Sequence, residues 1–439
     1  MKFFRYSKIF AAASIALSSS VAFAQSIMVE SGKPGGVYNV GEKIVWHLKV
    51  TGENASAVTK ISYVLKEGQI KETGHGELLL KDGAADLEAT MSSPGSIVAY
   101  LTAATGVPDK PTIKEFAGAL VAPEQIQPSA PRPTDFDAFW KSKVEELQKV
   151  PMNPVLTPGE SDRNTADYWQ VTLDNIRGTH IQGQLSRPKG NQKLPALLIV
   201  QWAGVYPLQK GWVTQHGTNG WLTLNINAHD LPIDQQPSFY DDVLKTKLEN
   251  NYSAIGNEDK DTSYFLRMYL SCYRAIEYLK SRDDWDGKTL VVMGSSQGGL
   301  QTLMIGGLYP GKITALIANV PAGCDQTGPA IERQSGWPMW WWQTKSRDAQ
   351  KVRETARYYD VVNFASHITA PTLVAVGLID QTCPPHGVYA AVNQMKGSKQ
   401  VLVMERSDHQ GKGNTQAPYY QRSAVWLQEL VKGNAPPLR

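Results

Sequence analysis

At 439 residues, the chain is longer than a single hydrophobic core comfortably supports, so its length predicts more than one domain. Its 44 basic and 41 acidic residues leave a net charge of only +3 without any strong basic run, which excludes long-range attraction for nucleic acid. The three cysteines are too few for a disulfide scaffold and too widely spaced for a zinc site, so we expect buried thiols with at most one bridge among them.

The first 24 residues have the pattern of a cleaved signal peptide. A positively charged start precedes a short apolar stretch rich in Ala and Ser, and Ala22-Phe23-Ala24 offers small residues where a signal peptidase reads them. The apolar stretch is shorter than the roughly 20 residues of a membrane-spanning helix. We therefore expect a soluble protein, secreted or periplasmic, that begins near Gln25.

Residues 25–122 are predicted to be all-β. The stretch 43–50 alternates apolar and polar residues, as a half-buried strand does. Further short strand candidates, separated by Gly, Asn, Asp and Pro, follow at 61–65, 77–80, 85–91 and 96–103. Short strands at this spacing favour a small β-sandwich of the immunoglobulin type.

A proline-rich link separates this part from a second predicted domain at 123–439. Its four prolines, between residues 123 and 133, fix φ and remove backbone donors, so the link should run extended. A helix is predicted to open at 135–140, with Thr134 as its N-cap and acidic residues in its first turn.

From about residue 168, strands alternate with helices. A strand pair at 168–173 and 179–186 comes first. Continuous apolar runs, typical of strands buried on both faces, follow at 196–201, 221–225, 289–293, 315–319, 372–376 and 400–404. Helical stretches lie between or after them, at 264–281, 300–308 and 417–431. The alternation predicts a mainly parallel sheet with helices on both faces and chemistry beyond the carboxyl ends of its strands.

The sharpest motif is G-x-S-x-G, in which Gly294 and Gly298 flank Ser296. It follows a β-branched strand and precedes a helix-forming run, which is the context that the motif requires in the α/β-hydrolase fold. A serine on so tight a turn has strained backbone dihedrals, so its neighbours two positions away must be small. Ser296 is predicted to be a nucleophile, and the alternative is a glycine-rich turn without chemistry.

A serine nucleophile needs a base that an acid orients, and in this fold the chain order is Ser, acid, His. His409 lies in a loop just after the last apolar strand and is the predicted base. His367 precedes a strand and lies at the wrong end of the sheet, whereas His386 lies in the loop assigned to the acid.

Asp380 is the predicted acid because it stands at the carboxyl end of the strand candidate 372–376. Asp360 precedes a strand, and Asp408 adjoins the base and would point elsewhere. Asp380 is therefore preferred to both.

Two backbone donors are needed to stabilise the negative charge that develops on the substrate oxygen. The N–H of Gln297, directly after the nucleophile, is the first predicted donor. The second is assigned to Val205 or Tyr206, in the loop after the strand candidate 196–201, where Gly204 permits close backbone approach.

Three side chains are predicted to contact the substrate. Trp202 lies in the same loop as the second backbone donor. Trp340 belongs to the tryptophan-rich segment 337–342, for which a substrate wall and plain packing are equal alternatives. His229 either reaches the pocket rim or forms part of a surface pair.

These residues resemble the acetyl xylan esterase and cephalosporin-C deacetylase family, carbohydrate esterase family seven. The likeness rests on 294–299, on the D-x-x-C-P-P element that begins at Asp380, on His409 and on the helix opening at 133–140, and it spans roughly 130–435. The chain departs from the family pattern in three places, which are 203–206, 228–230 and Gln410.

The resemblance implies a serine esterase that removes O-acetyl groups from acetylated xylan, xylo-oligosaccharides or similar glycans, without metal or cofactor. A serine peptidase of the prolyl-oligopeptidase type and a non-catalytic carbohydrate-binding protein on a hydrolase scaffold are the alternatives. The expected partner is an acetylated carbohydrate, with no nucleic acid or membrane, and a homo-oligomer is left open. We interpret the β-domain as a spacer or packing domain, ahead of a lid or a glycan contact.

Overall fold

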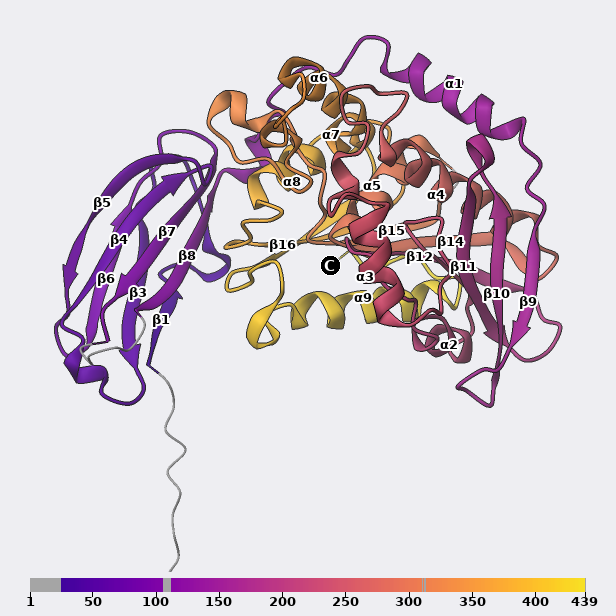
Figure 1. Cartoon of the computed structure of the whole chain (residues 1–439). Helices are drawn as coiled ribbons and strands as arrows, with labels where there is room; N and C mark the ends of the chain where they lie inside the picture. The colour runs from indigo at the N-terminus through magenta and orange to yellow at the C-terminus, as the bar shows by residue number, and fades with distance from the viewer. Residues whose placement is uncertain (1–24, 106–111, 310, 312, 439) are drawn as a thin grey trace, which may run out of the picture.

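The computed structural model describes residues 25–105, 112–309, 311 and 313–438 (Figure 1). The predicted signal peptide, 1–24, lies outside these residues. Within the described part of the chain, no helix has both the length and the apolar character needed to cross a membrane. Cys272, Cys324 and Cys383 are buried, as expected, and no disulfide joins any two of them.

Two small sheets form the N-terminal part of the described chain. Alternate residues of β3 are buried, from Ile44 through Trp46 to Val50, and they join side chains of both sheets in one core. The three-stranded sheet has the order β1 (Ser26–Ser31), β3 (Ile44–Thr51), β6 (Ala84–Ala89). The five-stranded sheet has the order β2 (Val37–Tyr38), β8 (Ile113–Val121), β7 (Gly95–Ala103), β4 (Lys60–Glu67), β5 (Lys71–Leu79).

A nine-stranded, mostly parallel sheet organises the rest of the chain and confirms the α/β-hydrolase fold. Its six parallel strands are rich in apolar residues and most of them are buried, and three antiparallel strands extend one edge. The strand order is β17 (Lys399–Met404), β16 (Thr372–Gly377), β15 (Ala315–Asn319), β14 (Trp285–Ser295), β12 (Leu194–Val200), β13 (Leu222–Ile226), β11 (His180–Pro188), β10 (Ala166–Asp174), β9 (Val155–Gly159).

Helices cover both faces of this sheet (Figure 1). Neighbouring residues of β12 show why: Leu198 packs in the core that holds α4, α5 and α7, whereas Leu197 packs in the core that holds α9. The helices are α1 (Phe136–Gln148), α2 (Gly211–Thr218), α3 (Pro237–Thr246), α4 (Tyr264–Ser281), α5 (Gln297–Leu308), α6 (Ala349–Tyr359), α7 (Val361–Ala365), α8 (Pro385–Val392) and α9 (Ala417–Leu430).

The start of α1 differs from the prediction by one residue. Asp135 rather than Thr134 occupies the N-cap position, and its side chain makes no capping hydrogen bond to the helix. Its carboxylate instead accepts hydrogen bonds from Lys260 and Tyr358, so a tertiary contact has replaced the local cap.

The five-stranded sheet packs against the hydrolase domain through β7 and β8. A Cβ atom built on Gly118 of β8 would lie 2.5 Å from the carbonyl oxygen of Leu378, so only glycine permits this approach. In β7, the Ser96 hydroxyl lies 2.6 Å from Nδ1 of the buried His386 at the start of α8. The contact therefore lies directly beside the loop that follows β16.

Candidate active site

Ser296 stands on a sharp turn between β14 and α5. Its φ of 57° and ψ of −118° are a strained combination for a residue with a side chain. A Cβ on Gly294 would lie 2.6 Å from the Gly298 carbonyl carbon, and one on Gly298 would lie 2.4 Å from the Val200 carbonyl oxygen. The crowding that the motif predicts is therefore present on both sides of the serine.

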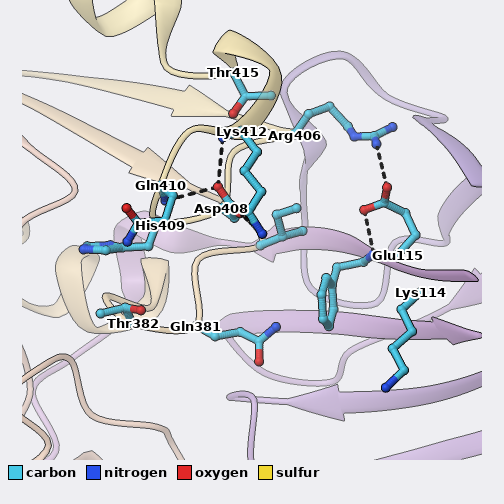
Figure 2. A pocket seen from close by; sticks show the side chains of 12 residues that line it. Lys114, Glu115, Gln381, Thr382, Arg406, Asp408, His409, Gln410, Lys412 and Thr415 are labelled. Atoms are coloured by element: carbon cyan, nitrogen blue, oxygen red, sulfur yellow. Dashed lines mark hydrogen bonds and ion pairs between the residues drawn. The ribbon is translucent and has the colours of Figure 1, made fainter. Parts of the chain in front are cut away.

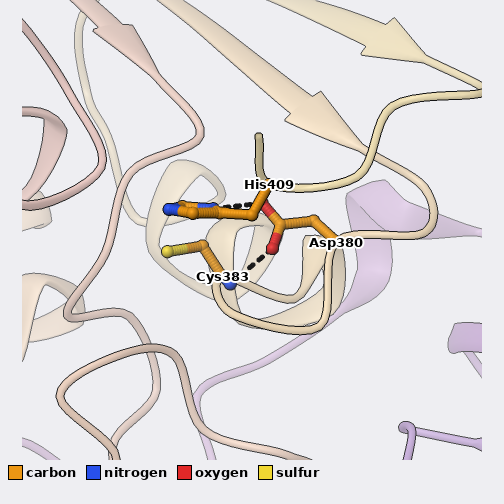
Figure 3. Close-up of side chains that lie close together, drawn as sticks. All are labelled: Asp380, Cys383 and His409. Carbon is orange, nitrogen blue, oxygen red and sulfur yellow. Dashed lines mark hydrogen bonds and ion pairs between the residues drawn. The ribbon is translucent and has the colours of Figure 1, made fainter. Parts of the chain in front are cut away.

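Two hydrogen bonds join Ser296, His409 and Asp380. Ser296 Oγ lies 2.8 Å from His409 Nε2, and His409 Nδ1 lies 2.8 Å from Asp380 Oδ2 (Figure 3). Because a carboxylate only accepts, Nδ1 carries the ring proton and Nε2 is free to accept from the serine hydroxyl. This tautomer is the one that a general base needs.

The acid is held by its own loop. Asp380 is fully buried, and its Oδ1 accepts hydrogen bonds from the backbone N–H groups of Thr382 and Cys383, at 2.8 and 2.7 Å. These donors compensate the buried negative charge and fix the plane of the carboxylate. The loop thus aims Oδ2 at the imidazole without a cationic partner for the acid among the described residues.

The rival carboxylates have other partners. Asp360 accepts hydrogen bonds from the backbone N–H groups of Asp325, Gln326 and Val362, and burial raises its pKa to about 7. Asp408 accepts hydrogen bonds from backbone N–H groups of its own loop.

The rival histidines also have partners elsewhere. His386 is fully buried, its Nε2–H donates to the Gln334 carbonyl and its Nδ1 accepts from Ser96. Burial lowers the pKa of His386 to about 4, so it stays neutral between the two parts of the chain. Nδ1 of His367 lies 3.8 Å from Oδ1 of Asp137 in α1.

Asp380, Cys383 and His409 place three potential metal-ligating atoms within 4.8 Å of one another (Figure 3). Burial raises the pKa of the Cys383 thiol well above its ordinary value, whereas a metal ligand must be a thiolate. The imidazole and the carboxylate are already bonded to each other and to backbone groups. These atoms therefore fit an acid and base pair better than a metal site.

The backbone N–H groups predicted to bind the oxyanion make no hydrogen bond to the described protein. Gln297 is the first residue of α5, and in the described chain no protein group accepts a hydrogen bond from its N–H. The N–H groups of Val205 and Tyr206 are equally unengaged by the described residues. The positive end of α5 adds to the attraction for an oxyanion at Gln297.

Buried side chains fix the Gly204 peptide group next to the second predicted donor. The Gly204 N–H donates to the Tyr252 hydroxyl at 3.2 Å, and the Gly204 carbonyl accepts from His229 Nε2 at 2.9 Å. Gly204 has a φ of 137°, which favours glycine. Tyr252 has no motif around it, so no sequence pattern indicates this role.

Two predicted substrate contacts are wrong. His229 is buried rather than at the pocket rim: its Nδ1 accepts from the Tyr264 hydroxyl at 2.7 Å, and burial lowers its pKa to about 4. Trp340 is 1% exposed, packs against Phe265 and donates its indole N–H to the Ser253 carbonyl at 2.7 Å. Both side chains have all their polar atoms satisfied inside the core, so neither is free to meet a ligand.

Ser296 opens into a cavity of about 620 Å³. Trp202 lines it, as predicted, with its ring stacked on Tyr206 at a centroid distance of 5.4 Å. Trp337 and Tyr420 also line it; the tryptophan-rich segment does reach the cavity, but through its first member. A second cavity, of about 690 Å³, borders His409 on the side of the N-terminal sheets (Figure 2).

The chain is similar to known esterases. The acetyl xylan esterase (AXE1) family model matches residues 119–430. Acetyl esterase Axe7A from Xylanibacter ruminicola is 32% identical over 402 residues, which are 90% of this chain and 88% of that protein. A match over 90% of the chain extends beyond the family model into the N-terminal sheets.

Two solved structures share the fold. Acetyl xylan esterase from Paenibacillus sp. R4 is 25% identical with a TM-score of 0.59, over 70% of this chain and 98% of that one. Acetyl xylan esterase 1 from Thermoanaerobacterium sp. JW/SL YS485 is 20% identical with a TM-score of 0.59, over 70% of this chain and 97% of that one. Each of these two esterases is matched over almost its whole length, whereas about 30% of this chain has no counterpart in either of them.

Proposed function

This chain belongs to the acetyl xylan esterase family, and from that premise we propose that it removes O-acetyl groups from carbohydrates such as acetylated xylan or xylo-oligosaccharides. The chain is an acetyl esterase and thus a carboxylic ester hydrolase. The observation that carries our proposal for the site is the pair of 2.8 Å hydrogen bonds that joins Ser296, His409 and Asp380.

In the first step, Ser296 Oγ attacks the acetyl carbonyl carbon while its proton passes to His409 Nε2. Asp380 keeps the ring in this orientation and stabilises the imidazolium that forms. The carbonyl oxygen becomes an oxyanion, and the N–H of Gln297 stabilises it together with that of Val205 or Tyr206. The tetrahedral intermediate then collapses: the C–O bond to the sugar breaks, and His409 returns the proton to the sugar oxygen.

In the second step, His409 takes a proton from water, whose oxygen attacks the acetyl-serine carbonyl. The second tetrahedral intermediate releases acetate and restores the Ser296 hydroxyl. All proton transfers in both steps pass through one nitrogen, Nε2 of His409, so no other titrating group of the chain is required.

We also propose that residues 1–24 are a signal peptide cleaved after Ala24, and that the mature protein is secreted or periplasmic. The positive start and the small residues at 22 and 24 support this. The boundaries at 25–122 and 123–439, and an immunoglobulin-type sandwich for the first of these, are proposals that rest on the strand spacing and the proline-rich link.

The test is Ser296→Ala. Because this removes the nucleophile, acetate release from acetylated xylo-oligosaccharides should fall by about 10⁴-fold or more, while the thermal unfolding midpoint changes little. A fluorophosphonate probe should label the wild-type protein and not the variant. A proline-containing peptide anilide should not be cleaved by either. An undiminished rate of acetate release in the variant would refute the assignment of Ser296.

A further inference from the structure

The cavity of about 690 Å³ beside His409 is bounded by both parts of the chain, and we refer to it as the interdomain cleft. Lys114, Glu115 and Phe116 of β8 line it from the N-terminal sheets. The acid loop contributes Gln381, and the loop after β17 contributes residues between 406 and 415 (Figure 2). One wall of the cleft is therefore built by a part of the chain that precedes the family match at 119–430.

The interdomain cleft adjoins the cavity at the nucleophile. Thr382, His409 and Gln410 line both cavities, so the base lies at the border between the two. The direct path of a ligand from Ser296 towards the interdomain cleft leads past His409.

The positions of the oxyanion donor and of the base determine which half of the substrate extends towards the interdomain cleft. The acyl carbonyl oxygen must face the N–H of Gln297, at the start of α5. The oxygen of the departing alcohol must instead lie at hydrogen-bond distance from His409 Nε2, because that atom protonates it. The departing sugar is therefore the half of the substrate beside His409, next to the entrance of the interdomain cleft.

The walls of the cleft are polar, but their charges are mostly paired. Arg406 lies 3.6 Å from Glu115, and Lys412 lies 3.7 Å from Asp408. Lys114 is the exception, since the described residues provide no ion-pair partner for it. Such a surface suits a neutral, hydroxyl-rich ligand better than a strongly charged one.

Phe116 supplies the apolar element that a sugar ring needs. It is half-buried and meets Tyr100 edge-on, with a centroid distance of 5.2 Å and an interplanar angle of 82°. The Tyr100 hydroxyl donates to Gln381 Oε1 at 3.5 Å, which ties this aromatic pair to the acid loop. An aromatic ring with amide and ammonium groups beside it matches the apolar C–H face and polar rim of a pyranose.

We propose that the interdomain cleft binds the sugar units of the departing glycan that lie beyond the acetylated one. β8 is then part of the substrate site, and the N-terminal sheets select for an extended oligosaccharide rather than serving as a spacer. The inference rests on the proposed esterase function. It gives a role to the N-terminal sheets, which lie almost wholly outside the family match at 119–430.

The experiment compares two substrates on the same variant of the full-length enzyme. For Phe116→Ala, the ratio of kcat/KM for an acetylated xylo-oligosaccharide to kcat/KM for 4-nitrophenyl acetate should fall about tenfold, because only the glycan reaches Phe116. For Lys114→Ala, the ratio should fall about threefold. Phe116→Tyr keeps an aromatic face and should restore most of the ratio. Any loss of folded enzyme cancels, since both substrates meet the same preparation.

Lys49→Ala is the matched control. Lys49 is an exposed lysine of β3 without an ion pair among the described residues, and it does not line the cleft, so its ratio should equal that of the wild type. A ratio that stays at the wild-type value in Phe116→Ala would overturn the cleft proposal. Failure of the proposed function looks different, because the wild-type protein itself would then release no acetate.

Discussion

At the scale of single residues, the two segments that carry the predicted oxyanion donors are linked by one buried hydroxyl. Tyr252 accepts a hydrogen bond from the Gly204 N–H at 3.2 Å and donates one to the Gln297 side-chain oxygen at 2.6 Å. Burial raises the pKa of this phenol well above its ordinary value, so it remains a neutral donor. The two backbone segments that must converge on one oxygen atom are thus joined behind the site.

Tyr252→Phe should therefore lower kcat by about tenfold to a hundredfold with a smaller effect on KM, because misplaced donors weaken transition-state stabilisation more than binding. Tyr240→Phe is the control, since this buried tyrosine hydrogen-bonds to Pro232 and Gln235 instead. Steady-state kinetics on 4-nitrophenyl acetate measure both variants. Equal kcat values for the two would contradict a role for Tyr252 in the site.

The site residues that could be predicted from the sequence are those that lie just beyond the ends of strands. Ser296 comes directly after β14, and Asp380 and His409 lie in the loops that follow β16 and β17, so the fold itself brings all three to one edge of the sheet. Trp340 and His229 were misplaced because their burial depends on side chains distant in the chain, such as Phe265 and Tyr264, that no local pattern reveals.

At the scale of elements, the acid loop between β16 and α8 depends on the N-terminal sheets. Gln69, in the turn between β4 and β5, donates from Nε2 to the Asp380 carbonyl oxygen at 2.8 Å, and both groups are buried. Gln334 donates its N–H to the Gly68 carbonyl at 2.8 Å, which fixes the same turn from the other side. The position of the acid is thus set partly by a turn some 300 residues earlier in the chain.

Gln69→Leu should lower the free energy of unfolding by about 1–3 kcal/mol, because the Asp380 carbonyl would lose its buried donor. It should also lower kcat severalfold, since Asp380 orients His409. Chemical denaturation and steady-state kinetics measure these effects. A stability loss without any change in kcat would show that Gln69 serves the interface alone.

Helices and strands were predicted accurately where the local sequence pattern alone indicates which residues are buried. Helix α4 was predicted with its observed bounds, 264–281, and the apolar runs became the parallel strands. β8 was missed because its last five residues are all buried, around Gly118 and next to Leu378, so it lacks the alternation of a half-buried strand. Its burial depends on contacts with residues far along the chain, such as Leu378, which the sequence of 113–121 alone does not reveal.

At the scale of the whole molecule, a neutral histidine lies in the contact between the two parts of the chain. His386 hydrogen-bonds to Ser96 on one side and to Gln334 on the other, and burial, aided by the nearby charge of Arg333, lowers its pKa from 6.5 to about 4. Its Nδ1 accepts a hydrogen bond from Ser96, so a proton there would reverse this bond and place a positive charge in a buried contact. The domain contact thus includes a group that resists protonation.

The folded protein should therefore lose stability as the pH falls from 6.5 towards 4. Over this range the unfolded chain binds a proton at His386 that the folded chain does not, so acid favours unfolding. The variant His386→Gln lacks this titrating group, so it takes up no proton at this position on unfolding. Between pH 7.5 and 5.0, the wild-type protein should lose about 2 kcal/mol more of its free energy of unfolding than the variant does.

His216 and His229, whose pKa values burial also lowers to about 4, are present in both proteins, so their contribution cancels in the difference. Urea titrations at several pH values measure this difference, and parallel stability curves for the two proteins would show that His386 takes up its proton equally well in the folded state.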